Sequence, residues 1–568
     1  MPFPTDIEIA QAATLLPPTE IAAQMGIPTD LLEPYGRSVA KIDLAAIEAL
    51  KDRPLAKYVV VSAITPTPLG EGKTTTTVGL GQAMKHVGKR ATIALRQPSM
   101  GPTFGIKGGA AGGGYSQVVP METLNLHLTG DFHAVTAAHN LLAAMVDNLL
   151  FAGGDVAGKH LRPGDVTWRR VMDVNDRALR NIIVGLGGTA DGVPRQTGFD
   201  ITAASEVMAI LALANSLDDL RARLERMVVG YTAKKEPVSA KEVGIAGAMA
   251  VILREAIKPN LMQTLENTPV LVHAGPFGNI AHGNSSVIAD LIGIRTGDYL
   301  ITEAGFGADM GAERFFNIKC RASGLKPDAG VAVATVRALK LHAGTHRVVA
   351  GKPLPEALLR ENPDEVRVGG ANLRKQIENM RIHGVAPVVA INAFPGDHPS
   401  EHAAIREIAE AAGARVAVAT HFTDGGKGAI DLANAVIEAC EEPSAFHLLY
   451  PSAMPLREKI ATIATEIYGA KDVSYTPGAS ASLDTFEKAG FGDLAVCIAK
   501  THLSISSDPK LTGAPTGWTL PVREVRASVG AGFIYPICGE MRTMPGLGAS
   551  PAALRIDLDD DGEIVGLS

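Results

Sequence analysis

The segment Tyr58–Thr77, YVVVSAITPTPLGEGKTTTT, determines how the rest of the chain is interpreted. It begins with an apolar, β-branched run typical of a buried parallel strand, continues as a Pro- and Gly-rich loop, and becomes helix-like over residues 74–87. Gly70 and Gly72 allow backbone N–H groups to converge, and Lys73 adds a positive charge beside the helix N-terminus. This combination indicates a loop that binds nucleotide phosphate.

The loop is a variant of the standard phosphate-binding motif. The pattern G-x-x-x-x-G-K-[ST] would place its first glycine at position 67, where this chain has Thr67. A surface Gly/Lys turn is the alternative, but such a turn rarely lies between a buried strand and a helix. The residues expected to contact the phosphates are Thr67, Pro68, Leu69, Gly70, Glu71, Gly72, Lys73 and Thr74.

A second basic residue follows the next predicted strand, Ala91–Leu95 (ATIAL). Arg96 stands at the carboxyl end of that strand, the edge at which open α/β sheets bind their ligands. We therefore expect Arg96 to face Lys73 across a bound nucleotide. A surface arginine that anchors a loop is the alternative.

Residues 105–117, GIKGGAAGGGYSQ, contain almost no side chains apart from Lys107 and Tyr115. So much glycine loses conformational entropy on folding without contributing to a core. The composition alone also fits a flexible linker, but serine is scarce and the segment lies inside a patterned α/β region. We expect a backbone that approaches a ligand closely or covers it.

Several polar residues are candidate metal ligands. His127, His133 and His139 are spaced by six residues, which rotates them off a common helix face and does not favour a transition-metal site. Asp131 is a candidate magnesium or water ligand, with a turn or capping role as the alternative. Glu303 follows an apolar strand, where phosphate-loop proteins often keep a magnesium-ordering acid; a buried acid satisfied by backbone donors is the alternative.

Strands, loops and helices alternate along most of the chain. The further predicted strands are residues 269–273 (PVLVH), 299–301 (YLI), 331–336 (VAVATV), 387–391 and 415–419. This alternation indicates an α/β fold: a phosphate-loop NTPase-like, doubly wound, mostly parallel sheet with additional smaller α/β domains.

The length of the chain, 568 residues, exceeds one ordinary core. A Pro-, Gly- and charge-rich stretch around residues 343–370 is the best boundary. We expect a large phosphate-loop nucleotide-binding domain over 1–360 with an N-terminal helical segment, and a second α/β domain over 361–530. A small C-terminal domain over 531–568 would pack with part of residues 30–58.

Phe394 and Phe422 each follow the carboxyl end of a predicted strand. Two aromatic rings in such loops are able to clamp a flat heterocycle, with roughly 0.5–1.5 kcal/mol per good stack beyond area burial. Ordinary core phenylalanines are the alternative.

The composition argues against several classes of protein. Lys+Arg 53 against Asp+Glu 60 gives a net charge of −7 and aromatic residues are only 5%, so the footprint of nucleic-acid binding is missing. The four cysteines are scattered without C-x-x-C spacing, which suits a reducing compartment. There is no apolar signal region and no uninterrupted apolar stretch of membrane-spanning length. We expect a cytoplasmic protein that binds neither nucleic acid nor membrane.

Taken together, these motifs resemble those of the formate–tetrahydrofolate ligase family, also called formyltetrahydrofolate synthetases. The motifs that carry the resemblance stand in the family's order: TPTPLGEGKTTT, GIKGGAAGGGYSQV, HLTGDFHA, PRQTGFDITAASEVMAI, AGPFGNIAHGNSS, TEAGFGADMGAERF, VATVRALK, INAFPGD, PLREKIATIATEIYGA and PTGWTLPVREVRASVGAGF. The similarity runs from about Pro34 to the MPGLGASPAA tail, and the long glycine signature is highly specific.

The resemblance implies an enzyme of one-carbon metabolism. Formate, tetrahydrofolate and ATP would give 10-formyltetrahydrofolate, ADP and phosphate. By analogy with the family, formate first attacks the γ-phosphorus to make formyl phosphate, and the folate N10 amine then attacks the activated carbon. The resemblance also implies Mg²⁺, stimulation by a monovalent cation such as K⁺ or NH₄⁺, and a homotetramer.

The resemblance assigns roles to the residues above. Lys73 and Arg96 would be the catalytic residues, with Lys73 on the transferring phosphoryl group and Arg96 on formate or formyl phosphate. The loop Thr67–Thr74 would cradle the ATP phosphates, and the Gly105–Gly114 segment would exclude water. The second domain would contribute to the folate site. The substrate-binding residues would be Arg96, Gln97, Tyr115, Phe306, Phe394 and Phe422, and the Mg²⁺ candidates are Thr74, Asp131 and Glu303.

Two positions depart from the family's pattern. The residue after the arginine is often Glu in the family and is Gln97 here, and the clamp position often held by Trp is Phe422. Both departures leave the chemistry possible and put folate affinity and polyglutamate preference in question.

Two other classes of protein compete with the ligase. A regulatory phosphate-loop ATPase of the partition or metallochaperone type often carries an extra lysine near the start of the loop, but this chain has Thr67 and Pro68 there. Such proteins are also usually about half this length. A non-catalytic nucleotide- or folate-binding module is the second alternative, and the presence of Lys73 and Arg96 argues against it.

Overall fold

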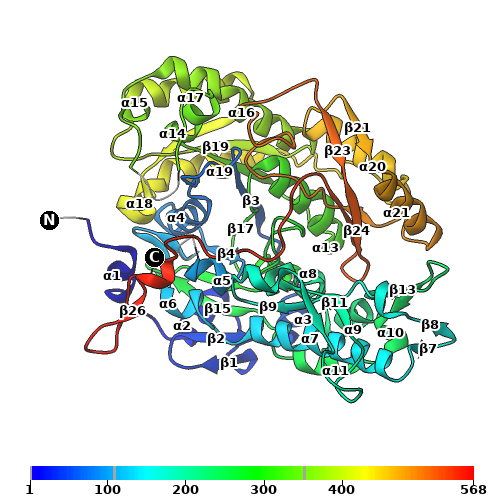
Figure 1. Cartoon of the computed structure of the whole chain (residues 1–568). Coiled ribbons are helices and arrows are strands. Elements are labelled where there is room, and N and C mark those ends of the chain that lie inside the picture. Colours follow the sequence, from blue (N-terminus) through cyan, green and yellow to red (C-terminus); the bar gives the residue numbers. More distant parts are fainter. Residues whose placement is uncertain (1–2, 106–110, 350–352, 568) are drawn as a thin grey trace.

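A large sheet of mainly parallel strands forms the centre of the computed structural model, which describes residues 3–105, 111–349 and 353–567 (Figure 1). The sheet has 12 strands. Its parallel part runs in the order β16 (Pro269–Val272), β4 (Ala91–Leu95), β17 (Tyr299–Glu303), β3 (Lys57–Ala63), β18 (Ala329–Ala334), β19 (Ala386–Asn392) and β20 (Arg415–Ala419).

One edge of the sheet is antiparallel. There β15 (Asn260–Thr264) pairs with β16, β2 (Val39–Ile42) and β6 (Ser116–Val119), β1 (Leu32–Tyr35) pairs with β2, and β5 (Gly112–Gly113) pairs with β6. The sequence predicted only short helices before residue 57. The helices α1 (Asp6–Gln11), α2 (Pro18–Met25) and α3 (Ala45–Ala49) are present, but the hairpin of β1 and β2 was missed. Strand β2 joins the sheet through β15, which lies more than 200 residues away.

Strand β3 is buried on both faces, as its continuous apolar run predicts. Val60 packs into one hydrophobic cluster with α7 (Asp131–Phe151), α8 (Glu206–Leu213), α11 (Ala246–Leu253) and α12 (Val287–Gly293). Its neighbours Val59 and Val61 pack into another cluster with α4 (Lys73–His86) and α19 (Ile430–Glu441). Alternate side chains of a strand point to opposite faces, so helices cover both sides of the sheet.

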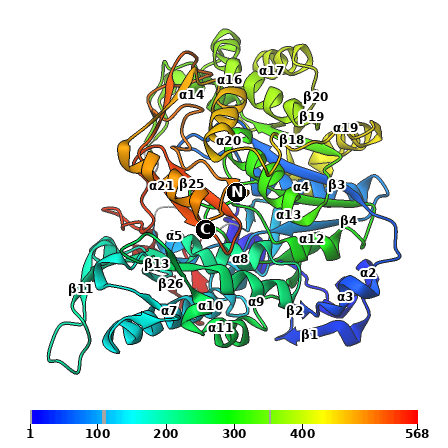
Figure 2. The same ribbon diagram turned by 90° about the vertical axis from the view of Figure 1, so that its right-hand side faces the viewer.

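The prediction of a mostly parallel α/β sheet is confirmed. The predicted strands are observed with bounds shifted by at most two residues, and the helix predicted over 74–87 is α4. In both views the helices α7, α10 and α11 lie in the lower part of the molecule, while α14 (Val336–His342), α16 (Pro363–Ile382) and α17 (Pro399–Ala411) lie in its upper part (Figures 1 and 2). Helix α10 covers Ala240–Val243.

The predicted boundary at residue 360 falls inside this sheet. It lies between α15 (Glu356–Leu359) and α16, and the flanking strands β18 and β19 are hydrogen-bonded neighbours. Beyond residue 450 a separate hydrophobic cluster unites α20 (Leu456–Thr462), α21 (Pro477–Lys488) and small sheets made of β21 (Asp472–Tyr475), β22 (Ala495–Val496), β23 (Thr519–Val522), β24 (Glu524–Ser528) and β25 (Phe533–Ile537). These orange elements face the viewer in Figure 2. The division into three domains stays a prediction.

The C-terminal tail returns to the N-terminus. Leu567 shares a hydrophobic cluster with Ile7 of α1 and Val39 of β2, and the Gln11 Nε2 donates to the Ile564 carbonyl at 3.4 Å. Both ends of the chain therefore lie on the same side of the molecule (Figure 1).

Helix α7 is the one helix of the described residues that is long and apolar enough to cross a membrane by length and composition. The sequence was expected to contain no apolar stretch approaching that length; α7 reaches it only with polar residues such as His133, Asn140 and Asp147 included. A helix in a protein core satisfies the same criterion, and α7 places Val135, Leu142 and other side chains in the main hydrophobic cluster.

Six buried histidines give a prediction for stability against pH. Burial lowers the pKa of His139 to about 3 and the pKa values of His273, His383 and His421 to about 4, and it lowers those of His282 and His342 as well. An unfolded histidine titrates near pH 6.5. The unfolded chain therefore binds more protons between about pH 6.5 and 4, and stability falls as the pH falls through this window.

Four acids act in the opposite direction, since burial raises the pKa values of Glu206 and Glu313 to about 7 and also raises those of Asp173 and Asp290. The six histidines outnumber these acids, so we expect the Tm to fall steadily from pH 6.5 to pH 4.5. The substitution His383→Gln should flatten this dependence, whereas His160→Gln, at an exposed position, should not. A Tm that stays constant over this range would contradict the prediction.

Candidate active site at the carboxyl edge of the sheet

The predicted phosphate loop connects the end of β3 at Ala63 with the start of α4 at Lys73. Gly70 and Gly72 have φ angles of 74° and 76°, in the left-handed region that favours glycine. A Cβ atom at Gly72 would lie 2.4 Å from Asn392 Nδ2, which donates to the Glu71 carbonyl. Helix α4 therefore begins directly after the loop. The first backbone N–H groups of a helix have no partner within the helix, so they are available to a ligand.

Glu71 organises the loop. Its carboxylate accepts hydrogen bonds from the Thr67 backbone N–H at 2.7 Å and from the Thr67 hydroxyl at 3.1 Å. Thr67 replaces the first glycine of the standard motif, and its backbone N–H is thus bonded to Glu71 of the same loop. Pro68 and Leu69 lie between these two partners at the tip of the loop.

Three predicted site residues from neighbouring strands meet at this edge. The Thr74 hydroxyl donates to Glu303 Oε2 at 2.7 Å, and Arg96 Nη2 lies 4.0 Å from Glu303 Oε1. Strand β17, which ends with Glu303, lies between β4 and β3, which lead to Arg96 and to the phosphate loop. Glu303 is the last residue of its strand, whereas the sequence placed it just beyond the strand end. One carboxylate therefore joins the phosphate loop to Arg96.

The Gly-rich segment after β16 covers Arg96. Arg96 Nη1 donates to the Pro276 carbonyl at 3.3 Å, and a Cβ at Gly283 would lie 3.8 Å from the same nitrogen. Gln97 is buried, and its backbone N–H donates to the Ala274 carbonyl at 2.8 Å. Arg96 and Gln97 therefore both lie under this segment, at the carboxyl edge of the sheet.

Several buried polar atoms around this site have no hydrogen-bond partner among the residues that the structure describes. These atoms are Arg96 Nε, Gln97 Oε1, both ring nitrogens of His282, Asn284 Oδ1 and Ser285 Oγ. Buried polar groups are nearly always paired, so such a cluster indicates groups available to a ligand. The sequence singled out the AGPFGNIAHGNSS segment but not His282, Asn284 or Ser285. The signal was present as three polar residues in close succession beyond a buried strand.

His282 is neutral in this environment. Burial lowers its pKa well below the ordinary value, and the nearby positive charges of Lys319, Arg96 and Arg314 lower it further. A neutral imidazole carries one N–H donor and one acceptor nitrogen. It adds hydrogen-bonding capacity to the site without adding charge.

The predicted aromatic residues fall into three places. Phe306 lies two residues after Ala304 in the loop beyond β17, and a Cβ at Gly278 would lie 2.9 Å from its ring. The Arg337 guanidinium lies over the Phe394 ring, 4.4 Å from its centroid. Each ring therefore stands beyond the carboxyl end of a parallel strand, as the sequence predicted for Phe394.

Phe422 and Tyr115 form a separate surface group. The Tyr115 backbone N–H donates to the Phe422 carbonyl at 2.8 Å, and Phe3 stacks on Phe422 with ring centroids 5.5 Å apart. Both predicted residues are partly exposed, Phe422 at 37% and Tyr115 at 41%. The adjoining Gly112–Gly113 strand is described, but residues 106–110 of the predicted cover, including Lys107, lie outside the described residues.

Asp131 lies away from Thr74 and Glu303. It is the first residue of α7, is buried, and pairs with Lys41 at 2.8 Å. Its other carboxylate oxygen accepts a hydrogen bond from Asn260 Nδ2 at 2.8 Å. These contacts favour the structural alternative for Asp131. In the described residues no group of three or more His, Cys, Asp or Glu side chains is arranged to hold a metal ion.

The arrangement defines a class of protein. An α/β sheet with a glycine-rich loop, a helix N-terminus and an arginine at its carboxyl edge is typical of enzymes that act on phosphorylated ligands. The family model described as formate–tetrahydrofolate ligase matches residues 4–568. The chain belongs to the formate–tetrahydrofolate ligase family.

Individual relatives agree over their full lengths. The chain is 70% identical to a formate–tetrahydrofolate ligase of Saccharopolyspora erythraea, with 100% of both chains covered. It is 64% identical to the enzyme of that name from Cutibacterium acnes and 57% identical to that from Chloroflexus aurantiacus, in each case with 99% of this chain and 100% of the relative covered.

Proposed function

We propose that this chain ligates formate to tetrahydrofolate with ATP, giving 10-formyltetrahydrofolate, ADP and phosphate. In the first step a formate oxygen attacks the γ-phosphorus and ADP leaves, which produces formyl phosphate. In the second step the folate N10 amine attacks the formyl carbon, phosphate leaves, and the amine loses its proton. The observation that carries this proposal is the contact of Thr74, Glu303 and Arg96 beside the phosphate loop.

The loop Thr67–Thr74 binds the ATP phosphates in this proposal. The N-terminus of α4 supplies N–H donors and a positive dipole end, and Lys73 neutralises charge on the transferring phosphoryl group. No protein nucleophile is required, so catalysis rests on positioning and electrostatic stabilisation.

The residues present fit a magnesium ion. The Thr74 hydroxyl and the Glu303 carboxylate place two oxygen atoms 2.7 Å apart at the phosphate loop. Mg²⁺ prefers oxygen ligands and is commonly held by one or two carboxylates together with substrate phosphates. When bound, the ion would supply charge neutralisation to the phosphates. Asp131 is the weaker candidate because both of its carboxylate oxygens have protein partners.

Arg96 holds formate and then formyl phosphate in this proposal. Its guanidinium faces the shared site, and a charge-assisted hydrogen bond of this kind is worth roughly 1.5–3 kcal/mol. Gln97, next to it, has a buried carbonyl oxygen available to a donor on the substrate. His282 offers further hydrogen bonds to the same ligand.

The folate would bind at the aromatic residues. The Phe306 ring lies against Gly278 of the segment that covers Arg96, while the Arg337 guanidinium lies over the Phe394 ring. Phe422 and Tyr115 form an exposed aromatic surface suited to a more distant part of the substrate. A cytoplasmic homotetramer and activation by K⁺ or NH₄⁺ are further proposals, which rest on the family resemblance alone.

The test is an assay in which formate, tetrahydrofolate, ATP and K⁺ are varied independently. We expect one ADP for each formyltetrahydrofolate formed, only when formate and tetrahydrofolate are both present, and faster turnover with K⁺. A regulatory ATPase would release ADP without either substrate, and that result would overturn the proposal. Omission of each substrate in turn is the control.

A further inference from the structure

Phe306 adopts a backbone conformation that its side chain does not favour. Its φ angle is 64°, in the left-handed region where a residue other than glycine is strained. Such a residue keeps this conformation only where its surroundings hold it. The surroundings of Phe306 therefore determine how the ring is presented to a substrate.

One face of the Phe306 ring is covered by His502. The two rings are nearly parallel, with centroids 4.6 Å apart and an interplanar angle of 19°. His502 belongs to the segment between β22 and β23, far from Phe306 in the chain. Because this face is occupied within the protein, only the opposite face of Phe306 remains for a flat substrate ring.

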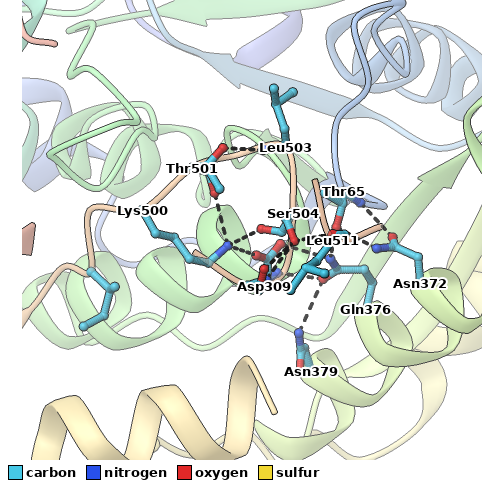
Figure 3. Close-up of polar contacts among 12 residues, drawn as sticks. Thr65, Asp309, Asn372, Gln376, Asn379, Lys500, Thr501, Leu503, Ser504 and Leu511 are labelled. Carbon is cyan, nitrogen blue, oxygen red and sulfur yellow. Dashed lines mark hydrogen bonds and ion pairs between the residues drawn. The ribbon is translucent and has the colours of Figure 1, made fainter. Parts of the chain in front are cut away.

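Lys500, two residues before His502, is anchored to the helical turn Ala308–Ala312, which directly follows the Phe306 loop. Its Nζ lies 2.9 Å from Asp309 Oδ2, three residues after Phe306, and donates to the carbonyls of Ser504 at 2.6 Å and Thr501 at 3.3 Å (Figure 3). These contacts use all three N–H groups of the ammonium. Its side chain is 0% exposed and that of Asp309 is 3% exposed, so water does not replace these contacts.

The same network reaches the start of the phosphate loop. The Asp309 backbone N–H donates to Gln376 Oε1 at 2.7 Å, and Gln376 Nε2 donates to Asp309 Oδ1 at 3.0 Å and to Thr65 Oγ1 at 3.1 Å. Asn372 exchanges two hydrogen bonds with Thr65, at 2.8 and 3.0 Å (Figure 3). Thr65 stands two residues after the end of β3, where the phosphate loop begins.

A buried ion pair of this kind is poorly explained by stability alone. Removing two charges from water is costly, and apolar replacements of a buried pair are often neutral or stabilising. A fully connected polar network does, however, fix the relative positions of the segments that it joins. The network here joins residues 500–504, the Phe306 loop, α16 and the phosphate loop.

We propose that residues 500–504 position the two halves of the active site. His502 fixes the orientation of Phe306 for the folate, and Lys500 fixes the start of the phosphate loop through Asp309, Gln376 and Thr65. Both are positioning residues, since they act through other side chains. This inference rests on the proposed ligase function and extends it to the C-terminal α/β elements.

The first test uses the ring stack. We expect His502→Leu to raise the KM for tetrahydrofolate about five-fold, the effect of losing one ring stack, with little change in the KM for ATP. His502→Phe, which keeps a flat ring without nitrogen atoms, should restore the KM. An unchanged KM in His502→Leu would overturn the role of His502. If His502→Phe did not restore the KM for tetrahydrofolate, the stacking role would also be overturned, because the imidazole nitrogens would then be required.

The second test uses the ion pair. Lys500→Met is compared with Lys340→Met, because Lys340 is likewise buried, pairs with Glu401 and donates to backbone carbonyls. Both variants should lower the Tm, but only Lys500→Met should lower kcat/KM for ATP and for tetrahydrofolate, by about ten-fold or more. If Lys500→Met does not fold, Asp309→Asn removes the charge while keeping the side-chain shape, and the same kinetic loss is expected.

Equal kinetics in the Lys500 and Lys340 variants would overturn the role of Lys500. Wild-type enzyme is assayed in parallel, which separates the test of the proposed function from the test of the positioning network. Absence of formate-dependent formylation in the wild type would refute the proposed function. An active wild type with unaffected variants would refute only the positioning network.

Discussion

The substitution Lys73→Ala is expected to lower kcat about 1,000-fold, the loss typical of removing one pre-positioned group that stabilises transition-state charge. Lys73 is the first residue of α4 and adjoins Thr74, which contacts Glu303. Alanine favours helix, so α4 should persist and the Tm should change little. The measurement is formyltetrahydrofolate formation at saturating substrates, together with thermal unfolding.

Lys85→Ala is the matched control for this substitution. Lys85 lies in the last turn of the same helix, is exposed, and donates to the Glu266 carbonyl at 3.3 Å. The same change of charge there should leave kcat unaltered. Near-normal kcat in a folded Lys73→Ala variant would remove Lys73 from the phosphate site.

The second large effect is expected at Arg96, where Arg96→Lys should lower kcat/KM for formate about 100-fold. The planar guanidinium is anchored by the Pro276 carbonyl while its other nitrogen faces Glu303. A lysine keeps the charge but not the two parallel N–H groups that fit a carboxylate or a phosphate. The KM for ATP should change much less than that for formate, which steady-state kinetics with each substrate varied will determine.

Arg90→Lys provides the control on the same strand. Arg90 stands at the opposite end of β4, pairs loosely with Asp298 and is 70% exposed in its side chain. It should have wild-type kinetics. If Arg96→Lys also retained full activity with formate, the assignment of Arg96 to the formyl group would fail.

Much of the fold was predictable because its signals are local. The apolar runs of β3, β4 and β17 and the glycines at 70 and 72 are read from short windows of sequence. Strands β1 and β2 were missed, since their hairpin joins the sheet only where β2 pairs with β15 across more than 200 residues. The boundary at residue 360 was placed on composition, whereas hydrogen bonding joins β18 to β19 across it.

The candidate site was likewise predictable where the signal is local in the sequence, and not where it depends on distant residues. Lys73, Thr74, Arg96 and Glu303 were predicted because each occupies a recognisable position at the end of a strand or the start of a helix. His282 and His502 were not singled out, because what surrounds them comes from distant parts of the chain. Asp131 was proposed as a magnesium or water ligand. Its carboxylate instead pairs with Lys41, which lies in β2, a strand that the sequence did not predict.

The sequence alone therefore determined the sheet type, the glycine-rich loop between β3 and α4 and the family resemblance, since these depend on hydrophobic period, glycine positions and contiguous motifs. Only the tertiary structure decided that Glu303 lies between Thr74 and Arg96, that Lys500 pairs with Asp309 and that His502 stacks on Phe306. The physical reason is that hydrogen bonds, ion pairs and ring stacks act over a few ångströms. Which residues come that close is set by the path of the whole chain.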